Sequence, residues 1–186
     1  MKTGKLPPEV LRRLLEKARL SQSVLIGPSL GEDAAAVRIG GKVLVAASDP
    51  VTFTTDRIGY YAVSVNANDI AAHGAEPRFF LATILLPEGS SESDAESVFE
   101  QIRTECERLD ISLIGGHTEV TPAVERAVVS GSMLGEVDEG SLVRTGGARA
   151  GDTLILAGKI AVEGTSILAR EAADDLRAKG VPDYVI

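Results

Sequence analysis

The chain has 186 residues, enough for one domain with its own hydrophobic core and a short further unit. Hydrophobic residues make up 44% and charged residues 25%, the proportions of a globular protein rather than of a disordered or fibrous one. The formal net charge of -8 argues against nucleic-acid and anionic-membrane partners, because those surfaces are bound by clustered Lys and Arg.

The single cysteine, Cys106, excludes an intramolecular disulfide and a multi-cysteine metal site, and it fits a reducing compartment. It lies in a segment with helical periodicity, where we expect it to pack as a small hydrophobic residue. No apolar run approaches the ~20 residues that span a bilayer, and residues 1–13 lack the apolar core of a signal peptide. The sequence therefore predicts a cytoplasmic protein.

The first part of the chain is predicted to form a helix, a loop and a hairpin. Apolar residues recur at helical spacing from Pro8 to Leu20. Residues 21–32 contain Gly and Pro without periodicity, which indicates a loop that ends beside Asp33. The apolar runs Ala34–Ile39 and Val43–Ala47 flank a Gly-Gly pair, and this pair permits the positive φ angles of a tight hairpin turn.

The middle of the chain is predicted to alternate helices and strands. Small and apolar residues fill Ile58–His73, which indicates a buried helix, and Phe79–Leu86 is a continuous apolar run typical of an internal strand. Ser91–Leu109 has the periodicity of an amphipathic helix, and the strands Ile111–Ile114 and Arg126–Val137 follow. This order predicts one mixed β-sheet with helices mainly on one face, an α+β domain.

The composition changes near residue 141. Gly and Ala are frequent in residues 141–152, and a strand, Thr153–Ala157, and a helix, Gly164–Lys179, are predicted to follow. One strand and one helix bury too little apolar area to offset a chain entropy of about 1–2 kcal/mol per residue, so this unit is expected to dock on the first domain or on a partner. The predicted division is a domain at 1–140, a linker at 141–152 and the beginning of an incomplete domain at 153–186.

Three aspartates lie at positions where their charge is expected to have a specific partner. Asp33 follows the glycine-containing loop, Asp49 follows the second hairpin strand, and Asp69 lies inside the helix predicted to be buried. A carboxylate buried without a partner is strongly unfavourable, so Asp69 is expected to face a cation, hydrogen-bond donors or solvent. Asn66 and His73 share its helix face, because they lie at i-3 and i+4.

These aspartates suit a magnesium site, because Mg²⁺ is commonly held by one or two carboxylates and by substrate phosphates. Asn68 lies about 100° round the helix from Asp69 and flanks the same site. The alternative is that Asp33 and Asp49 cap turns, as Asp often does, while Asp69 pairs with an Arg. Spacing alone leaves both interpretations open.

Five short segments occur in a characteristic order and rough spacing. They are Gly31–Ala35, Ser48–Pro50, Val65–Ala71, Gly74–Pro77 and Gly115–Thr118. Together they make the chain resemble the PurM-like (aminoimidazole ribonucleotide synthetase-related) superfamily, which includes thiamine-monophosphate kinase, selenophosphate synthetase and the hydrogenase maturation factor HypE. The run from Gly115 to Val120 is most similar to the HypE branch.

The resemblance implies that the domain binds ATP and Mg²⁺. Asp33, Asp49 and Asp69 would hold magnesium that bridges ATP phosphates, and the loop at Gly31 would lie along those phosphates. The full set of implied nucleotide-binding positions is Gly31, Asp33, Asp49, Asn68, Asp69, His117 and Thr118. The resemblance also implies a homodimer in which the two sheets form a shared barrel.

The chain departs from the family in three ways. His117 stands where thiamine-monophosphate kinase and HypE have Asp, and selenophosphate synthetase resembles this chain there. It either contacts phosphate or substrate, or is a hydrogen-bonded structural histidine. In the family, a segment like Arg144–Asp152 leads into a second domain of similar size, whereas in this chain only residues 153–186 follow it. HypE also carries its substrate on a cysteine at the chain end, whereas Cys106 is internal, so thiocarboxamide chemistry on this chain alone is not expected.

The leading hypothesis is an ATP- and magnesium-dependent enzyme, or the ATP-binding half of one, that activates an oxygen of a small-molecule or protein-bound acceptor by phosphoryl transfer. One alternative is a small-molecule kinase resembling thiamine-monophosphate kinase, whose Val-Asn-x-x-Asp motif occurs at Val65–Asp69. Another is a non-catalytic nucleotide-binding or regulatory domain. Because the chain is acidic, phosphate binding needs local cations, and Lys2 and Lys5 are candidates.

Overall fold

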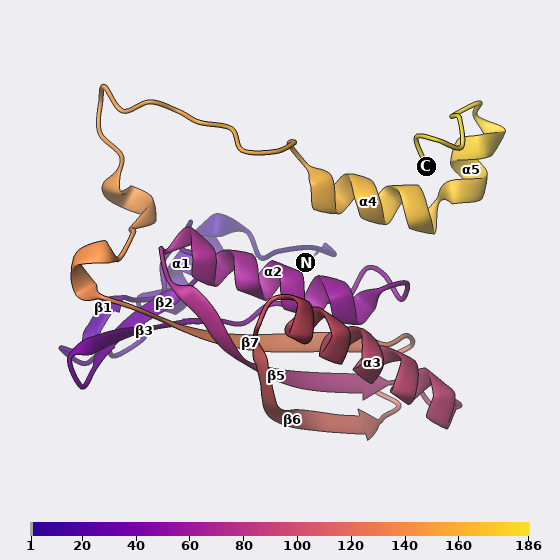
Figure 1. Ribbon diagram of the computed structural model, residues 1–186, viewed down its shortest axis with the longest axis horizontal. Coiled ribbons are helices and arrows are strands. Elements are labelled where there is room, and N and C mark those ends of the chain that lie inside the picture. Colours follow the sequence, from indigo (N-terminus) through magenta and orange to yellow (C-terminus); the bar gives the residue numbers. More distant parts are fainter. Residues whose placement is uncertain (1) are drawn as a thin grey trace.

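The fold is built on one mixed sheet, seen in the computed structural model of the chain, which describes residues 2–186 (Figure 1). The strand order is β1-β2-β3-β7-β5-β6, and β4 also pairs with β7. Neighbouring strands are antiparallel except for β5 and β6, which run parallel. The strands are β1 Val24–Ile26, β2 Ala35–Ile39, β3 Lys42–Ala47, β4 Pro50–Val51, β5 Glu76–Leu86, β6 Ser112–Val120 and β7 Val128–Val137.

Two long helices, α2 and α3, cover one face of this sheet (Figure 1), which confirms the predicted α+β class. The helices are α1 Pro8–Leu15, α2 Ile58–Ala72, α3 Glu92–Arg108, α4 Val162–Glu171 and α5 Ala173–Ala178, with 3₁₀ turns at Glu139–Ser141 and Thr145–Gly147. Helix α1 ends at Leu15 rather than at the predicted Leu20. It has no buried residue, and a short helix without tertiary packing is only marginally stable.

The core lies between the sheet and the two long helices. Side chains alternate between the faces of a strand, so every second residue of β3, β5 and β7 is buried under α2 and α3. The fully buried examples are Val43, Val45, Phe80, Val129 and Met133. Within residues 2–186, no helix is long and apolar enough to cross a membrane.

Strand β6 is longer than predicted. The predicted strand stops at Ile114 because the glycines that follow indicate a loop, but the ladder with β5 continues to Val120. Gly115 and Gly116 both have φ of 147°, a conformation that side chains disfavour, and the register shifts beside them. The glycines therefore form an irregular edge strand, which places His117 and Thr118 in the sheet.

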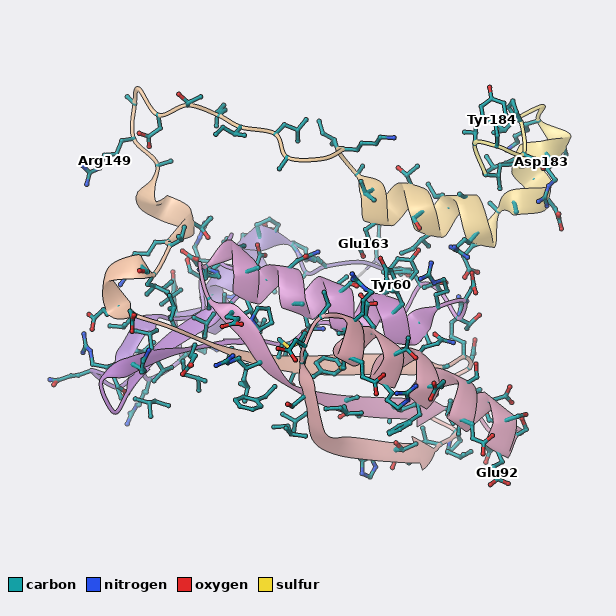
Figure 2. The ribbon with its side chains drawn as sticks, in the orientation of Figure 1. Tyr60, Glu92, Arg149, Glu163, Asp183 and Tyr184 are labelled. Atoms are coloured by element: carbon teal, nitrogen blue, oxygen red, sulfur yellow. The ribbon has the colours of Figure 1, made fainter. Side chains whose placement is uncertain are left out.

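The predicted strand Thr153–Ala157 is wrong, because this segment is an unpaired coil. Leu154 is 98% exposed and Ile155 is 85% exposed, since no neighbouring strand in the described part of the chain offers hydrogen-bond partners or a surface to pack on. The coil runs at a distance from the sheet toward α4, and the nearby Arg149 extends from the segment before it (Figure 2). An apolar run forms a strand only where another strand pairs with it.

The predicted helix Gly164–Lys179 is present as two helices, α4 and α5, which meet at Ala172. Helix α4 docks beside α2 (Figure 1), where the Ser166 and Tyr61 hydroxyls lie 2.5 Å apart and Arg170 donates to Asp56 at 2.7 Å. Polar contacts therefore hold α4 against α2 and the segment before it. The division of the chain into domains remains a prediction.

Candidate functional site

The β2–β3 hairpin brings two of the predicted aspartates to one end of the sheet. Ala35 pairs with Ala46, while the hairpin turn joins the strands at their other end. The residue before β2 and the residue after β3 must therefore lie near each other, and these regions contain Asp33 and Asp49. Asp33 is exposed and Asp49 is half-buried.

Helix α2 brings the third aspartate to the same place. Its Asn66 side chain bonds to the backbone of Asp49, and Asp69 follows one helical turn later. Burial raises the pKa of Asp69 to about 6, and the negative charges of Asp49 and Asp33 contribute to the rise. Asp49 and Asp33 therefore lie close enough to Asp69 to act on it electrostatically.

Asp69 lacks the Arg partner that the alternative interpretation required. In the described part of the chain, its Oδ2 atom is buried and has no hydrogen-bond partner. A buried polar atom without a partner is rare in native proteins and calls for a bound ion, water or ligand. The donor set, carboxylate oxygen, is the type that hard divalent cations such as Mg²⁺ prefer.

The carboxylates do not form a ready-made metal cage. Among residues 2–186, no three His, Cys, Asp or Glu side chains are grouped closely enough to hold a metal ion by themselves. Mg²⁺ keeps several waters and is usually held by one or two carboxylates together with substrate phosphates, so it does not require a complete protein cage. The residues present fit magnesium bound together with a phosphate ligand.

A lysine of the N-terminal segment acts on this cluster. The positive charge of Lys5 favours the ionised form of Asp69 and so opposes the rise in its pKa, as does His73 to a smaller extent. Lys5 therefore lies near enough to Asp69 for its charge to act on that carboxyl group.

The loop that carries Gly31 and Asp33 is tied to the segment that leaves the sheet. Gly31 has φ of 86°, and the next residue, Glu32, accepts a hydrogen bond from the Thr145 hydroxyl at 2.8 Å. His73 is buried and its Nδ1 lies 2.9 Å from the Val143 carbonyl oxygen. These contacts hold the start of the connecting segment against the acidic loop.

His117 and Thr118 lie in β6, at the edge of the sheet, and the structure does not bring them to the aspartates. Gly116 pairs with Ala82, Ala82 pairs with Gly131, and Gly131 bonds to Asp49, so three strand spacings of about 4.8 Å separate Gly116 from Asp49. That separation is too large for one metal ion with ligand distances of about 2 Å.

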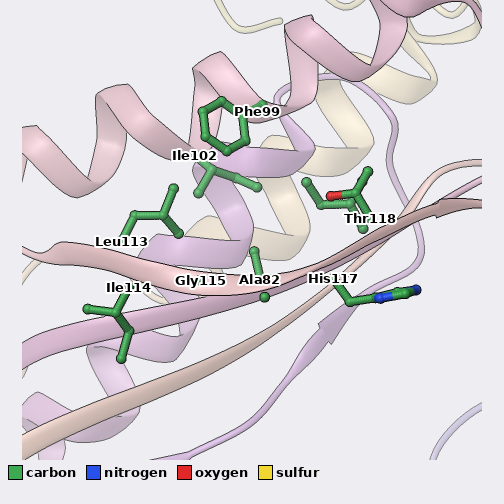
Figure 3. A pocket seen from close by; sticks show the side chains of 10 residues that line it. Ala82, Phe99, Ile102, Leu113, Ile114, Gly115, His117 and Thr118 are labelled. Carbon is green, nitrogen blue, oxygen red and sulfur yellow. The ribbon is translucent and has the colours of Figure 1, made fainter.

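The two β6 residues also face opposite sides of the sheet. His117 pairs in register with Thr83 on the face opposite α2 and α3, and its Nε2 lies 3.1 Å from Glu119. Thr118 lies on the helix side and lines a pocket of about 420 Å³ with Phe99 and Ile102 (Figure 3). Asn68 is exposed next to Asp69 on α2. Of the predicted positions, the three aspartates, Gly31 and Asn68 gather in one region, and the β6 pair does not.

The features above define a class of protein: an α+β domain with helices on one face of a mixed sheet and an acidic cluster where sheet and helix meet. Residues 31–137 match the family model "AIR synthase related protein, N-terminal domain". The chain belongs to this family, which confirms the PurM-like resemblance predicted from its motifs.

Relatives of two kinds are similar to the chain. A Methanocaldococcus jannaschii protein named for hydrogenase expression or formation is 31% identical over 92% of this chain and 53% of its own length. The thiamine-monophosphate kinase of Bacillus subtilis is 32% identical over 61% of this chain and 35% of its own. Carbamoyl dehydratase HypE of Cupriavidus necator is 28% identical over 75% and 42%. The chain thus spans about half or less of the length of these relatives.

Solved structures share the fold. The structure of AaThiL complexed with AMPPCP and TMP has a TM-score of 0.60 and 25% sequence identity, over 76% of this chain and 43% of that chain. The structure of tt0281 from Thermus thermophilus has a TM-score of 0.61 at 20% identity, over 72% and 44%. Both support the sheet and helix arrangement described above.

Proposed function

We propose that the chain is the ATP- and magnesium-binding part of an enzyme that activates a substrate oxygen by phosphoryl transfer. The observation that carries this proposal is the buried Oδ2 of Asp69, which has no hydrogen-bond partner within residues 2–186 and experiences the charges of Asp33 and Asp49. Such a cluster is destabilising alone and becomes favourable with a divalent cation. The related AaThiL structure supports the choice of nucleotide, because AMPPCP is an analogue of ATP.

The residues of the chain would have distinct roles. Asp33, Asp49 and Asp69 would hold the cation, and the backbone of the Gly31 loop would lie along the phosphates, with Asn68 at their side. Bound Mg²⁺ would supply neutralisation of the charge that develops on the transferred phosphoryl group. Lys5 would add positive charge in a chain whose net charge is -8. Its part would be to reduce repulsion between the acids and the phosphates.

Titration calorimetry with ATP tests this proposal. The chain is expected to bind ATP in the presence of Mg²⁺ and to bind it at least about tenfold more weakly with EDTA, because the acids repel phosphate without a cation. Asp49→Ala is expected to remove the magnesium dependence, while Glu88→Ala, a change at an exposed acid outside the cluster, leaves it intact. Equal affinity with and without Mg²⁺, or an unchanged Asp49→Ala protein, contradicts the proposal.

Two acceptor chemistries follow from the relatives. Similarity to a hydrogenase formation protein covers 92% of the chain, which favours a HypE-like role in hydrogenase maturation with a protein-bound acceptor. The 32% identity with thiamine-monophosphate kinase favours a small-molecule acceptor as the second candidate. Measurement of the ADP formed with thiamine monophosphate or with a peptide acceptor separates them, because transfer of the phosphoryl group to either acceptor leaves ADP. ATP binding without turnover of either, even with a C-terminal domain of a relative added, indicates a non-catalytic nucleotide-binding or regulatory domain.

We also propose that the protein is a homodimer, with no nucleic-acid or membrane partner. Supporting this, β6 is an edge strand whose residues from Ile114 to Val120 are all exposed. The face of the sheet opposite the helices includes apolar side chains such as Phe79, which is 44% exposed. An exposed edge beside an apolar face is typical of a surface covered by another chain. The expected dimer would place the two open faces against each other as a shared barrel.

A further inference from the structure

Asn66 is a polar side chain in an apolar place. It is fully buried in α2, whose neighbouring residues Ala62, Val63, Ala67 and Ile70 are buried and apolar. A buried amide is costly unless its hydrogen bonds are made, so a buried Asn in a helix packed on a sheet needs partners of its own. The structure supplies them from Asp49 of the acidic cluster and from Ala62 of the same helix.

The side chain of Asn66 holds the backbone of Asp49 on both sides. Its Oδ1 accepts from the Asp49 N–H at 2.9 Å, and its Nδ2 donates to the Asp49 carbonyl at 3.1 Å. The second Nδ2 hydrogen goes to the Ala62 carbonyl at 2.8 Å. Gly131 N–H also donates to the Asp49 carbonyl at 3.0 Å. Every donor of the amide is thus used, and both backbone polar groups of Asp49 are fixed.

The sheet leaves space for this amide and for little else. A Cβ atom on Gly131 would lie 2.4 Å from Asn66 Nδ2 and 2.6 Å from the Phe80 ring, which is closer than real side chains approach. The glycine in β7 therefore lets α2 bring the amide within reach of Asp49. The position of Asn66 along the helix also sets where Asp69 lies, one turn further on the same face.

We infer that Asn66 is a positioning residue that sets the separation between the carboxylates of Asp49 and Asp69 before a cation binds. The inference rests on the proposed function of this site. The two carboxylates repel each other, and that repulsion acts to separate the end of β3 from α2. The paired hydrogen bonds of Asn66 oppose the separation, so the cation finds its ligands already placed, which lowers the entropy cost of binding.

Substitution of Asn66 tests this role against a purely structural one. Asn66→Ala is expected to weaken Mg²⁺-dependent ATP binding by about tenfold or more, as loss of residues that orient metal ligands commonly does. Val63→Ala, at a fully buried position on the same helix, is the control for stability. Both variants are compared by calorimetry below their melting temperatures, with the Mg²⁺ concentration for half-maximal binding as the readout. Val63→Ala is expected to stay within about twofold of the unmodified chain.

The outcomes separate this inference from the proposed function. If the unmodified chain shows no Mg²⁺-dependent binding, the proposed function fails. If Asp49→Ala weakens binding but Asn66→Ala behaves like Val63→Ala, only the positioning role is overturned. Should Asn66→Ala not fold, hydrogen exchange on the unmodified chain decides: the Asp49 amide is expected to be protected without ligand. Exchange as fast as in the exposed loop, with protection appearing only after Mg²⁺ and ATP are added, overturns the role.

Discussion

The Asp69 carboxyl group has a buried oxygen that receives no hydrogen bond from the described chain. The group is partly buried on α2, and Asp49 and Asp33 add repulsion. The result is a pKa raised from 3.8 to about 6. A site that is unfavourable in the free protein and relieved by a ligand is common where function requires it, and removal of such a residue often stabilises the fold.

The raised pKa predicts how stability depends on pH. The native state keeps the Asp69 proton to a higher pH than the unfolded chain, so the free energy of unfolding falls as pH rises from about 4 to about 6 and stays lower above that. Asp69→Asn cannot ionise and is expected to melt at a higher temperature than the unmodified chain at pH 7, with the difference shrinking toward pH 4. Thermal melts between pH 4 and pH 8 measure this.

The same variant is expected to lose Mg²⁺-dependent ATP binding, because a carboxylate oxygen is removed from the site. Glu88→Gln, at an exposed loop position, serves as the control and is expected to show no such pH-dependent difference. A melting difference for Asp69→Asn that is constant from pH 4 to pH 7 contradicts the argument.

At the scale of elements, the contact between α2 and α3 depends on a glycine. A Cβ atom on Gly59 would lie 2.7 Å from Gln101 Cβ and 2.8 Å from the backbone of Ile102 and Val98. Gln101 also accepts a hydrogen bond from the Gly59 N–H at 3.0 Å, which satisfies one free donor at the start of α2. The two helices therefore approach closely where α2 begins, and α2 also carries Asn66 and Asp69.

Gly59→Ala is expected to lower stability by about 1–3 kcal/mol, although Ala is the better helix former, because the added methyl group overpacks the helix contact. Gly164→Ala in α4 is the matched control, since no atom lies within 4 Å of the Cβ it would add. That change is expected to be neutral or to stabilise by up to about 1 kcal/mol. Urea unfolding of both proteins measures the difference, and equal effects of the two substitutions would show that the helix contact is not tight.

At the scale of the whole molecule, the two faces of the sheet differ in how far helices cover them. Helices α2 and α3 cover one face, and α4 docks beside α2 (Figure 1). On the other face Phe79 is 44% exposed, and β6 has no second strand partner within residues 2–186. Edge strands are usually protected by charge, by a bulge or by pairing, and the β6 residues from Ile114 to Val120 are exposed.

Light scattering tests the proposed dimer. The unmodified chain is expected to have twice the chain mass of 19.5 kDa, and Ile114→Glu on β6 is expected to shift it to a monomer, because a buried carboxylate opposes association. Leu154→Glu is the control, an equivalent change at a site that is 98% exposed in the coil after the sheet. A monomeric unmodified chain at about 50 μM, a typical concentration for stable association to show, contradicts the dimer, as does dissociation by Leu154→Glu alone.

Local sequence patterns were sufficient to predict much of the fold. The apolar runs on either side of Gly40-Gly41 formed the β2–β3 hairpin, and the helical periodicities at 58–73 and 91–109 formed α2 and α3. The acids of the candidate site could also be chosen from sequence, because a charge in an apolar helix or at a strand end is expected to have a specific partner. These features depend on neighbours within a few residues along the chain, and such neighbours can be read from the sequence.

Pairing and burial depend on residues far apart in the chain, and only the tertiary structure decided them. It extended β6 through the glycines because β5 offered a parallel partner, and it left Thr153–Ala157 unpaired because no strand was beside it. It also placed His117 away from the aspartates. The sequence alone determined which residue types were available to bind a cation. The tertiary structure decided which of them meet: the β2–β3 hairpin places Asp33 near Asp49, and the hydrogen bonds of Asn66 join Asp49 to α2, which carries Asp69.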